Sequence, residues 1–281
     1  MPTVDLASWK SQHLAGLRKV SSTAEIEINA LLVHVLNKNT AWIFSHPETH
    51  LTAEQTALLE NAISRLYAGE PLAYITRKQE FYGLEFLVDS RVLIPRPETE
   101  LLVEHAITWL NTHPAKKLAA DIGTGSGAIA VTLAKSCSEL EVTAIDISEE
   151  ALEVAKENAR KHKVERRIEF VHANLLQGNT KKFDLILANL PYIPTATLKE
   201  LDALRYEPQT ALDGGHDGMD FIKQLMAQLP NSLAPGGSAI FEIQYNQGYK
   251  VREIARQQFP EALISIQHDL ASLPRIVVIN T

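Results

Sequence analysis

From Lys117 onward the chain alternates between short apolar segments of strand-forming residues and amphipathic segments with helical spacing. The expected strands are 118–122, 142–147, 168–171, 183–188, 238–243, 263–266 and 276–279, and the expected helices include 128–135, 149–161, 221–229 and 249–258. A helix between two strands returns the chain to the same edge of a sheet, so consecutive strands run parallel and helices cover both faces. This pattern predicts an α/β fold with a doubly wound, about seven-stranded, mostly parallel sheet.

Residues 1–70 show helical spacing of apolar residues and no strand signal. The indicated helix starts are Asp5, the capping-box pair Ser22 and Glu25, and the capping-box pair Thr52 and Gln55. Gly69 followed by Pro71 ends the last of these helices. Because a chain of 281 residues favours one large and one smaller domain, we interpret residues 1–70 as a helical substrate-recognition domain.

Residues 71–95 change character, because strand formers here flank turn signals at Gly83 and at the Asp89–Ser90 pair. We interpret this stretch as a β-hairpin linker between the helical domain and the main domain. The main domain is expected to cover residues 96–281, and Pro97 suits the first turn of its first helix.

A glycine-rich turn follows the first strand of the predicted sheet. Residues 121–127 read Asp-Ile-Gly-Thr-Gly-Ser-Gly and open a helix, which is the context of a nucleotide-binding turn. Asp146 ends the next strand, where an acidic side chain can accept hydrogen bonds from the hydroxyls of a ribose. The stretch therefore predicts a nucleotide-containing cofactor.

The surroundings of this turn favour S-adenosylmethionine over a nicotinamide dinucleotide. The spacing is Gly-x-Gly-x-Gly, and no acid or base for hydride chemistry follows the fourth strand. Asp121 can bind the cationic amino group of a methionine, and Asn174 with Leu175 falls where the adenine edge would lie. The predicted cofactor-binding residues are Asp121, Gly123, Thr124, Gly125, Ser126, Gly127, Asp146, Asn174, Leu175 and Asn189.

The fourth strand ends abruptly in Asn189-Leu190-Pro191-Tyr192. Asn189 offers a carbonyl acceptor, and Pro191 restricts Leu190 to extended geometry, which directs the Leu190 carbonyl outward. Two acceptors beside the Tyr192 ring suit a planar NH₂ group held next to a methyl donor. We therefore interpret these four residues as catalytic, although a strand ending in a turn is an equal explanation of the four residues alone.

Composition limits the remaining function classes. Hydrophobic residues make up 45% of the chain, enough for a sizeable core, and the net charge of −7 argues against tight binding to nucleic acid or an anionic membrane. No apolar run approaches membrane-spanning length, and the start of the chain lacks a signal-peptide pattern. We expect a cytoplasmic protein that binds neither membrane nor, stably, nucleic acid.

Two further segments resemble a known family. Val92-Leu93-Ile94-Pro95-Arg96-Pro97-Glu98-Thr99-Glu100, and the Glu207-Pro208 pair followed by residues 211–218, are similar to motifs of the peptide chain release factor N5-glutamine methyltransferases. The resemblance implies a Rossmann-like class I methyltransferase domain and a small N-terminal helical domain. It also implies S-adenosylmethionine as cofactor, S-adenosylhomocysteine as product, and class 1 release factors as partners, methylated at the glutamine of their Gly-Gly-Gln motif.

The chain departs from the family pattern in two places. Leu190 stands where the family usually has proline, and Asn-Leu-Pro-Tyr is also the form seen in ribosomal RNA adenine dimethyltransferases. Asn174 stands where an acidic residue is frequent, and Leu175 replaces a common aromatic residue. The alternatives are therefore an adenine-N6 methyltransferase acting on RNA or DNA and a non-catalytic binding protein that keeps the cofactor fold.

Two other groups of polar residues lie in a turn and at a strand end. Asp213, His216, Asp217 and Asp220 lie among glycines, which indicates a turn, so we expect no metal site. Glu242 and Gln244 lie at the end of the fifth strand and either border the substrate pocket or form a strand-end polar pair.

Overall fold

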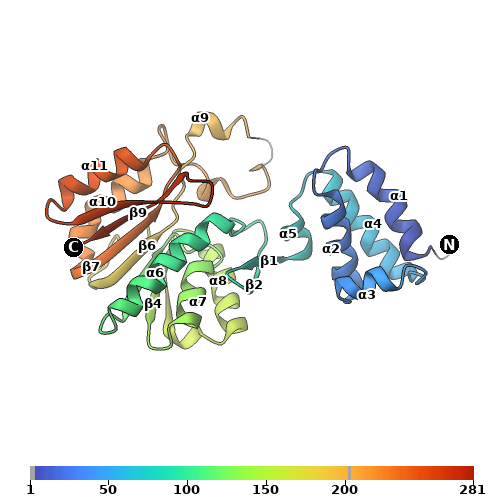
Figure 1. Ribbon diagram of the computed structural model, residues 1–281, viewed down its shortest axis with the longest axis horizontal. Helices are drawn as coiled ribbons and strands as arrows, with labels where there is room; N and C mark the ends of the chain where they lie inside the picture. The colour runs from blue at the N-terminus through green and yellow to red at the C-terminus, as the bar shows by residue number, and fades with distance from the viewer. Residues whose placement is uncertain (1–3, 202–203) are drawn as a thin grey trace. The chain divides into compact units, whose positions relative to one another are not determined.

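The computed structural model of the protein describes residues 4–201 and 204–281 (Figure 1). The chain divides into two compact units, Met1–Arg77 and Lys78–Thr281. Within the described residues, no helix is both long enough and apolar enough to cross a membrane.

The first unit is all-helical. Its helices are α1 (Leu6–Leu17), α2 (Ala24–Leu36), α3 (Thr40–Ser45), α4 (Ala53–Tyr67) and α5 (Leu72–Thr76). Buried apolar side chains from these helices form one core, which includes Trp9, Leu17, Ile28 and Leu59. The predicted N-terminal helical region is therefore confirmed.

Two of the three predicted helix starts in this unit are confirmed. The Asp5 carboxylate accepts a hydrogen bond from a first-turn N–H at 2.8 Å, and Thr52 forms a reciprocal capping box with the residue three positions on. The predicted start at Ser22 and Glu25 is wrong, because α2 follows Thr23. The backbone of Thr23 is not in the extended conformation that directs a capping side chain at the free N–H groups.

The β-hairpin belongs to the second unit. Strands β1 (Lys78–Phe81) and β2 (Leu84–Leu87) pair antiparallel, and β2 packs against helix α8 (Glu149–His162). The residues between 71 and 77 form helix α5 instead of the start of the predicted hairpin, because Pro71 precedes a further helical turn. The division between the units lies at Arg77, later than the predicted end of the helical domain at residue 70.

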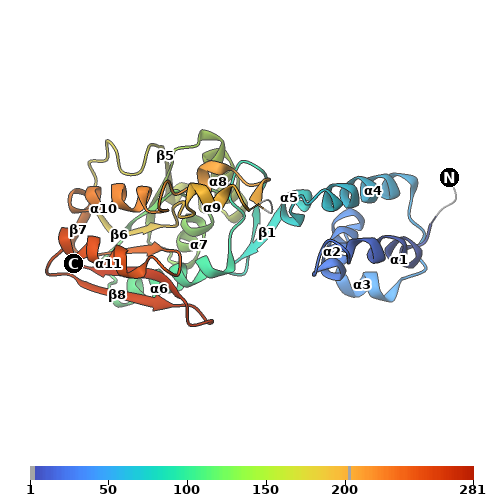
Figure 2. The same ribbon diagram turned by 90° about the horizontal axis from the view of Figure 1, so that it is seen from above.

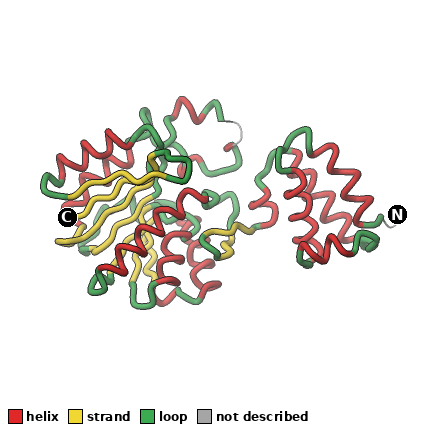
Figure 3. The backbone as a smooth tube through the Cα atoms, in the orientation of Figure 1, coloured by secondary structure: helices red, strands yellow, loops and turns green. Residues whose placement is uncertain are grey.

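The second unit is built around a seven-stranded sheet within the described residues (Figure 3). Its strands are β3 (Leu118–Ile122), β4 (Glu141–Asp146), β5 (Ile168–His172), β6 (Phe183–Ala188), β7 (Leu233–Glu242), β8 (Leu263–His268) and β9 (Pro274–Asn280). They are ordered β5-β4-β3-β6-β7-β9-β8, and of these seven strands β9 runs opposite to the other six. The predicted doubly wound, mostly parallel sheet is confirmed.

Helices cover both faces of this sheet (Figures 1 and 2). One face carries α6 (Glu100–Thr112), α7 (Ala128–Ser136) and α8, and the other carries α10 (Asp220–Ser232) and α11 (Gly248–Gln258). The shorter elements are the 3₁₀ turns Pro97–Thr99, Glu165–Arg167 and Gln209–Ala211, and helix α9 (Thr195–Leu198). The core between the layers contains buried apolar side chains that include Ile122, Phe183, Ile186, Leu225, Phe241 and Val277.

The order of the strands determines where a ligand can bind. The chain leaves β3 for β4 and β5 on one side and returns to β6 on the other, so the strand order reverses between β3 and β6. Ile122 and Ala188 are register partners at the carboxyl ends of these two strands. A crevice opens at such a reversal, which places the candidate site directly after Ile122 and Ala188.

Candidate active site

The glycine-rich turn connects β3 to α7. Gly123 has a φ of +73°, and a Cβ at this position would lie 3.1 Å from a Leu190 methyl group. Gly127 has a φ of +79°, and a Cβ there would lie 3.1 Å from Ala155 of α8. These two glycines allow the turn to pack against neighbouring elements, whereas a Cβ at Gly125 would point into open space.

Asp121 is completely buried beneath this turn. Its Oδ2 accepts hydrogen bonds from the Thr124 hydroxyl at 2.6 Å and from the Ala130 N–H at 3.1 Å. Its Oδ1 is buried and has no hydrogen-bond partner among the described residues. Burial raises the pKa of Asp121 to about 7, and a cation at Oδ1 would favour the ionised form that burial disfavours.

Asp146 lies at the end of β4 and faces the same turn. Its Oδ2 accepts a hydrogen bond from the Gly125 N–H at 2.8 Å, and its Oδ1 accepts one from the Ser148 N–H at 2.9 Å. Burial raises the pKa of the Asp146 carboxyl. Each oxygen retains acceptor capacity, which is what two neighbouring hydroxyl groups of a ribose require.

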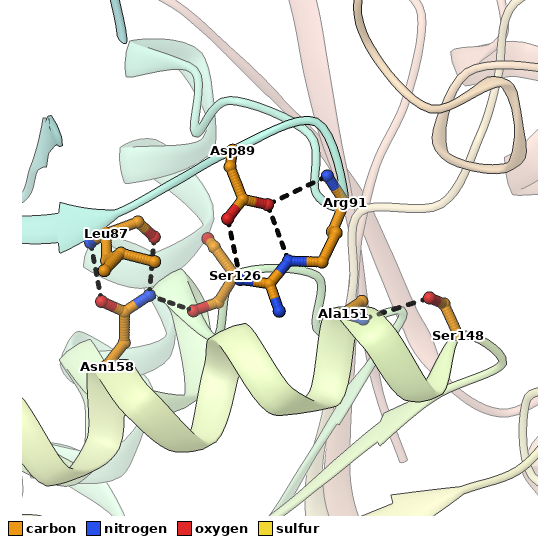
Figure 4. A network of polar contacts seen from close by, with 7 residues as sticks. All are labelled: Leu87, Asp89, Arg91, Ser126, Ser148, Ala151 and Asn158. Carbon is orange, nitrogen blue, oxygen red and sulfur yellow. Dashed lines mark hydrogen bonds and ion pairs between the residues drawn. The ribbon is translucent and has the colours of Figure 1, made fainter. Parts of the chain in front are cut away.

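Asn158 joins the turn to the β-hairpin (Figure 4). Its Nδ2 donates to the carbonyls of Leu87 and Ser126, both at 2.9 Å, and its Oδ1 accepts from the Leu87 N–H at 2.7 Å. This fully buried amide holds the backbone of Ser126 against α8. Nearby, Arg91 forms a bidentate ion pair with Asp89, at 2.7 and 2.8 Å.

A cavity of about 560 Å³ opens at the ends of β3, β4 and β6. The predicted site residues that line it are Gly123, Gly125, Asp146, Asn174, Leu175, Asn189, Leu190 and Pro191. Asp121, Thr124, Ser126, Gly127 and Tyr192 are not among its lining residues; Asp121 lies beneath the glycine-rich turn, and Tyr192 follows the lining residue Pro191. Residues 208–211 and Arg91 contribute further walls, which sequence reasoning did not assign.

Asn189 is oriented by a chain of hydrogen bonds. Its Nδ2 donates to the Thr99 hydroxyl at 3.0 Å, and that hydroxyl donates to Oε2 of Glu242 at 2.6 Å. Neither Oδ1 of Asn189 nor the Leu190 carbonyl accepts a hydrogen bond from a described residue. These two oxygens are therefore available to accept hydrogen bonds from a ligand in the cavity.

Glu242 is completely buried and also accepts a hydrogen bond from the Tyr192 hydroxyl at 3.4 Å. Burial raises the pKa of Glu242 to about 7. Burial, together with the charge of Glu242, also raises the pKa of Tyr192, which stays protonated at neutral pH. Thr99 and Glu242 thus connect Asn189 and Tyr192 into one polar network.

The segment after Tyr192 is held by a second glycine-rich loop, residues 213–218. Ile193 and Asp213 form a parallel β-bridge, and Gln247 donates from Nε2 to the carbonyls of Tyr192 and Gly218 at 3.3 and 3.0 Å. A Cβ at Gly218 would lie 2.2 Å from the Tyr192 carbonyl oxygen. The loop can approach the proposed catalytic turn, residues 189–192, this closely because position 218 is a glycine.

Glu207 is buried and joins the two segments of the family resemblance. It accepts a hydrogen bond from the Ile94 N–H at 3.1 Å and forms a short ion pair with Arg96. This contact holds the segment 92–99, which contains Thr99, against Glu207. The residues that follow, 208–211, form one wall of the cavity.

Two acidic residues of the second loop are paired with side chains of neighbouring helices. Asp213 accepts from the Thr195 hydroxyl at 2.6 Å, which lowers the pKa of its carboxyl, and Asp217 pairs with Lys223 at 2.9 Å. Across residues 4–201 and 204–281 no group of three or more acidic, histidine or cysteine side chains is placed to hold a metal ion.

The chain matches two family models and several known proteins in sequence. Residues 97–203 match the family model described as "Methyltransferase small domain", and residues 8–76 match the "PrmC N-terminal domain". The release factor glutamine methyltransferase of Koribacter versatilis is 42% identical over 271 residues, covering 95% of this chain and 94% of the relative. The protein of the same description from Bacillus anthracis is 36% identical over 284 residues, covering 99% and 98%.

Solved structures with the same fold are more distant in sequence. The hMettl16 catalytic domain, crystallised with a MAT2A 3'UTR hairpin, has a TM-score of 0.58 and 15% identity, with 82% of each chain covered. A methyltransferase from Pyrococcus furiosus has a TM-score of 0.51 and 19% identity, covering 79% of this chain and 98% of its own. These two likenesses concern the fold alone.

Proposed function

This chain belongs to the release factor glutamine methyltransferase family, and we propose that its cavity after β3 and β6 is where the methyl group is transferred. The acceptor would be the side-chain nitrogen, N5, of the glutamine in the Gly-Gly-Gln motif of a class 1 release factor. The observation that carries this assignment is the orientation of Asn189. Its NH₂ group is engaged by Thr99, while its oxygen is available to the cavity beside the Leu190 carbonyl.

The residues around the glycine-rich turn fit S-adenosylmethionine as donor. The buried, unpaired Oδ1 of Asp121 suits the ammonium group, and the Asp146 carboxylate suits the ribose hydroxyls. Asn174 and Leu175 line the cavity where an adenine would lie. When bound, S-adenosylmethionine supplies a methyl group on a cationic sulfur, which keeps the electron pair of the broken bond and leaves as part of S-adenosylhomocysteine.

The substrate amide would be held by two oxygens of the catalytic turn. The Asn189 Oδ1 and the Leu190 carbonyl accept its two N–H hydrogens, which directs the nitrogen lone pair, otherwise delocalised, toward the methyl donor. Such positioning supplies much of the rate in a reaction without a strong nucleophile. The Tyr192 ring favours the positive charge that develops on the nitrogen. The methylated nitrogen is strongly acidic, so it loses its proton to water and no carboxylate base is needed.

The substrate identity can be tested by isotope transfer. Purified protein and labelled S-adenosylmethionine are incubated with a class 1 release factor, with ribosomal RNA or with DNA. We expect label in the release factor and none in a release factor whose Gly-Gly-Gln glutamine is replaced by alanine. Label in RNA or DNA instead would support an adenine-N6 methyltransferase, and no label in any of them would support a binding protein.

The role of Asn189 can be tested in the same assay. Asn189→Ala is expected to abolish transfer while S-adenosylmethionine still binds, as measured by calorimetry. Asn179→Ala removes an amide elsewhere in the same unit and is expected to change neither property. Retained turnover in Asn189→Ala would contradict the assignment.

A further inference from the structure

The amide of Asn189 ends a directed chain of hydrogen bonds. A threonine hydroxyl has one proton to donate, and the hydroxyl of Thr99 donates it to Glu242 at 2.6 Å. Toward Asn189, the Thr99 oxygen can therefore only accept. The Asn189 amide must present its NH₂ to Thr99, which leaves its oxygen facing away from Thr99.

We propose that Glu242 and Thr99 are positioning residues that select the productive orientation of the Asn189 amide. The ionised Glu242 carboxylate can only accept, so it fixes the direction of the Thr99 hydroxyl and, through it, the direction of Asn189. The proposal rests on the proposed function in one respect, namely that the Asn189 oxygen holds the substrate amide.

Protonation of Glu242 would remove this preference for one orientation of the Asn189 amide. A protonated carboxyl can donate to Thr99, whose hydroxyl is then free to donate toward Asn189 and to favour the reversed amide. In that orientation the NH₂ of Asn189 faces a substrate NH₂, and the two cannot form a hydrogen bond. The orientation of Asn189 therefore depends on pH through Glu242.

The groups around Glu242 allow this change near neutral pH. The burial of Glu242, with the nearby carboxylate of Glu98, favours its neutral form, whereas Thr99, Tyr192 and the Arg275 guanidinium favour its charged form. Burial is the largest of these effects and raises the pKa of Glu242 to about 7. Tyr192 stays protonated in this range and does not take the proton.

Variants at Thr99 test the hydrogen-bond chain. Thr99→Val removes the hydroxyl and is expected to lower kcat about tenfold or more, the worth of one ordinary hydrogen bond, with the Kd for S-adenosylmethionine unchanged. Thr99→Ser restores the hydroxyl and is expected to recover most of kcat. Thr132→Val makes the same hydroxyl-to-methyl change at a buried position whose hydroxyl has no hydrogen-bond partner among the described residues, and should leave kcat unaffected. A Thr99→Val variant with unchanged kcat, or a Thr99→Ser variant no better than it, would overturn the proposal.

The pH profile tests Glu242. At saturating S-adenosylmethionine, the kcat of the wild type is expected to fall below about pH 7 and to level off near the kcat of Thr99→Val, in which Asn189 is no longer oriented. Glu242→Gln keeps an acceptor for Thr99 and a donor for the Tyr192 oxygen, so it should retain activity and lose this acidic limb. An acidic limb with the same midpoint in Glu242→Gln would refute the role of Glu242.

A measurement without release factor separates this proposal from the substrate assignment. In protein labelled with ¹⁵N-asparagine, the side-chain amide signals of Asn189 are identified by their loss in Asn189→Ala. We expect these signals to titrate near pH 7 in the wild type and not in Glu242→Gln. Signals that do not titrate in the wild type would contradict the proposal even if the enzyme methylates release factors.

Discussion

Gly214 lies against the carbonyl of Pro191, so closely that a Cβ at Gly214 would be 2.7 Å from the Pro191 oxygen. The same Cβ would lie 2.8 Å from Cα of Tyr192. Both neighbours are backbone atoms and cannot move aside without moving the catalytic turn. The second glycine-rich loop therefore acts as a support on which Pro191 and Tyr192 rest.

Gly214→Ala is expected to lower kcat by about tenfold or more, because the added methyl displaces the turn that carries Asn189. The comparison is Gly178→Ala, which is strained by a φ of +75° but meets no atom within 4 Å. Gly178→Ala should lower the melting temperature and leave kcat unchanged. Equal kcat values in the two variants would show that the close approach at Gly214 does not matter for catalysis.

The elements that could be predicted from sequence are those encoded locally. The strands, the Asp121–Gly127 turn and the end of β6 each carry their signal within a few residues, since they depend on side-chain alternation, glycine conformation and a proline. Their convergence on one cavity follows from the order of a doubly wound sheet. Eight of the predicted site residues accordingly line the same cavity.

The supports of the site were not predictable in this way. Thr99 and Asn189 are 90 positions apart in the chain, and Thr99 and Glu242 are 143 apart. Their contacts depend on how the segment 92–99, before α6, crosses the ends of β6 and β7. No local pattern in the sequence specifies that crossing. Asn158 was missed for the same reason, although a polar amide on the buried face of an otherwise amphipathic helix was a usable signal.

Binding of S-adenosylmethionine is expected to release a proton. Burial raises the pKa of free Asp121 to about 7, and an ammonium group at its Oδ1 lowers that pKa in the complex. Below pH 7, Asp121 must therefore lose a proton on binding, and the apparent affinity should rise with pH until about 7 and then level off. Calorimetry at pH 6 in buffers of different ionisation enthalpy measures the released proton. Asp121→Asn should bind S-adenosylmethionine more weakly and release no proton on binding. If the wild type also releases no proton, the ammonium group does not lie at Asp121.

Glu242 is expected to make folding less favourable as pH rises. Its pKa is near 4.5 in the unfolded chain and about 7 in the folded protein, so the folded state binds the proton more tightly. The stabilising contribution is full below pH 4.5 and is lost as the pH rises through 7. The unfolding free energy of Glu242→Gln minus that of the wild type should increase between pH 5 and pH 8, by about 3 kcal/mol at most. Urea unfolding at both pH values measures this difference, and Glu169→Gln, a change at an exposed ion pair, should not show it.

Asn158→Asp is expected to damage both folding and cofactor binding. The substitution keeps the shape of the side chain but replaces the NH₂ that donates to the carbonyls of Leu87 and Ser126 with an acceptor. A buried carboxylate facing two carbonyl oxygens should cost about 3 kcal/mol or more of unfolding free energy. Because Ser126 belongs to the turn that would hold S-adenosylmethionine, the Kd for this ligand should also rise.

Asn111→Asp, on the exposed end of α6, is the matched control and should change neither quantity. If the Kd of Asn158→Asp equals that of the wild type at a temperature where both are folded, the hairpin contact stabilises the domain without shaping the cofactor turn.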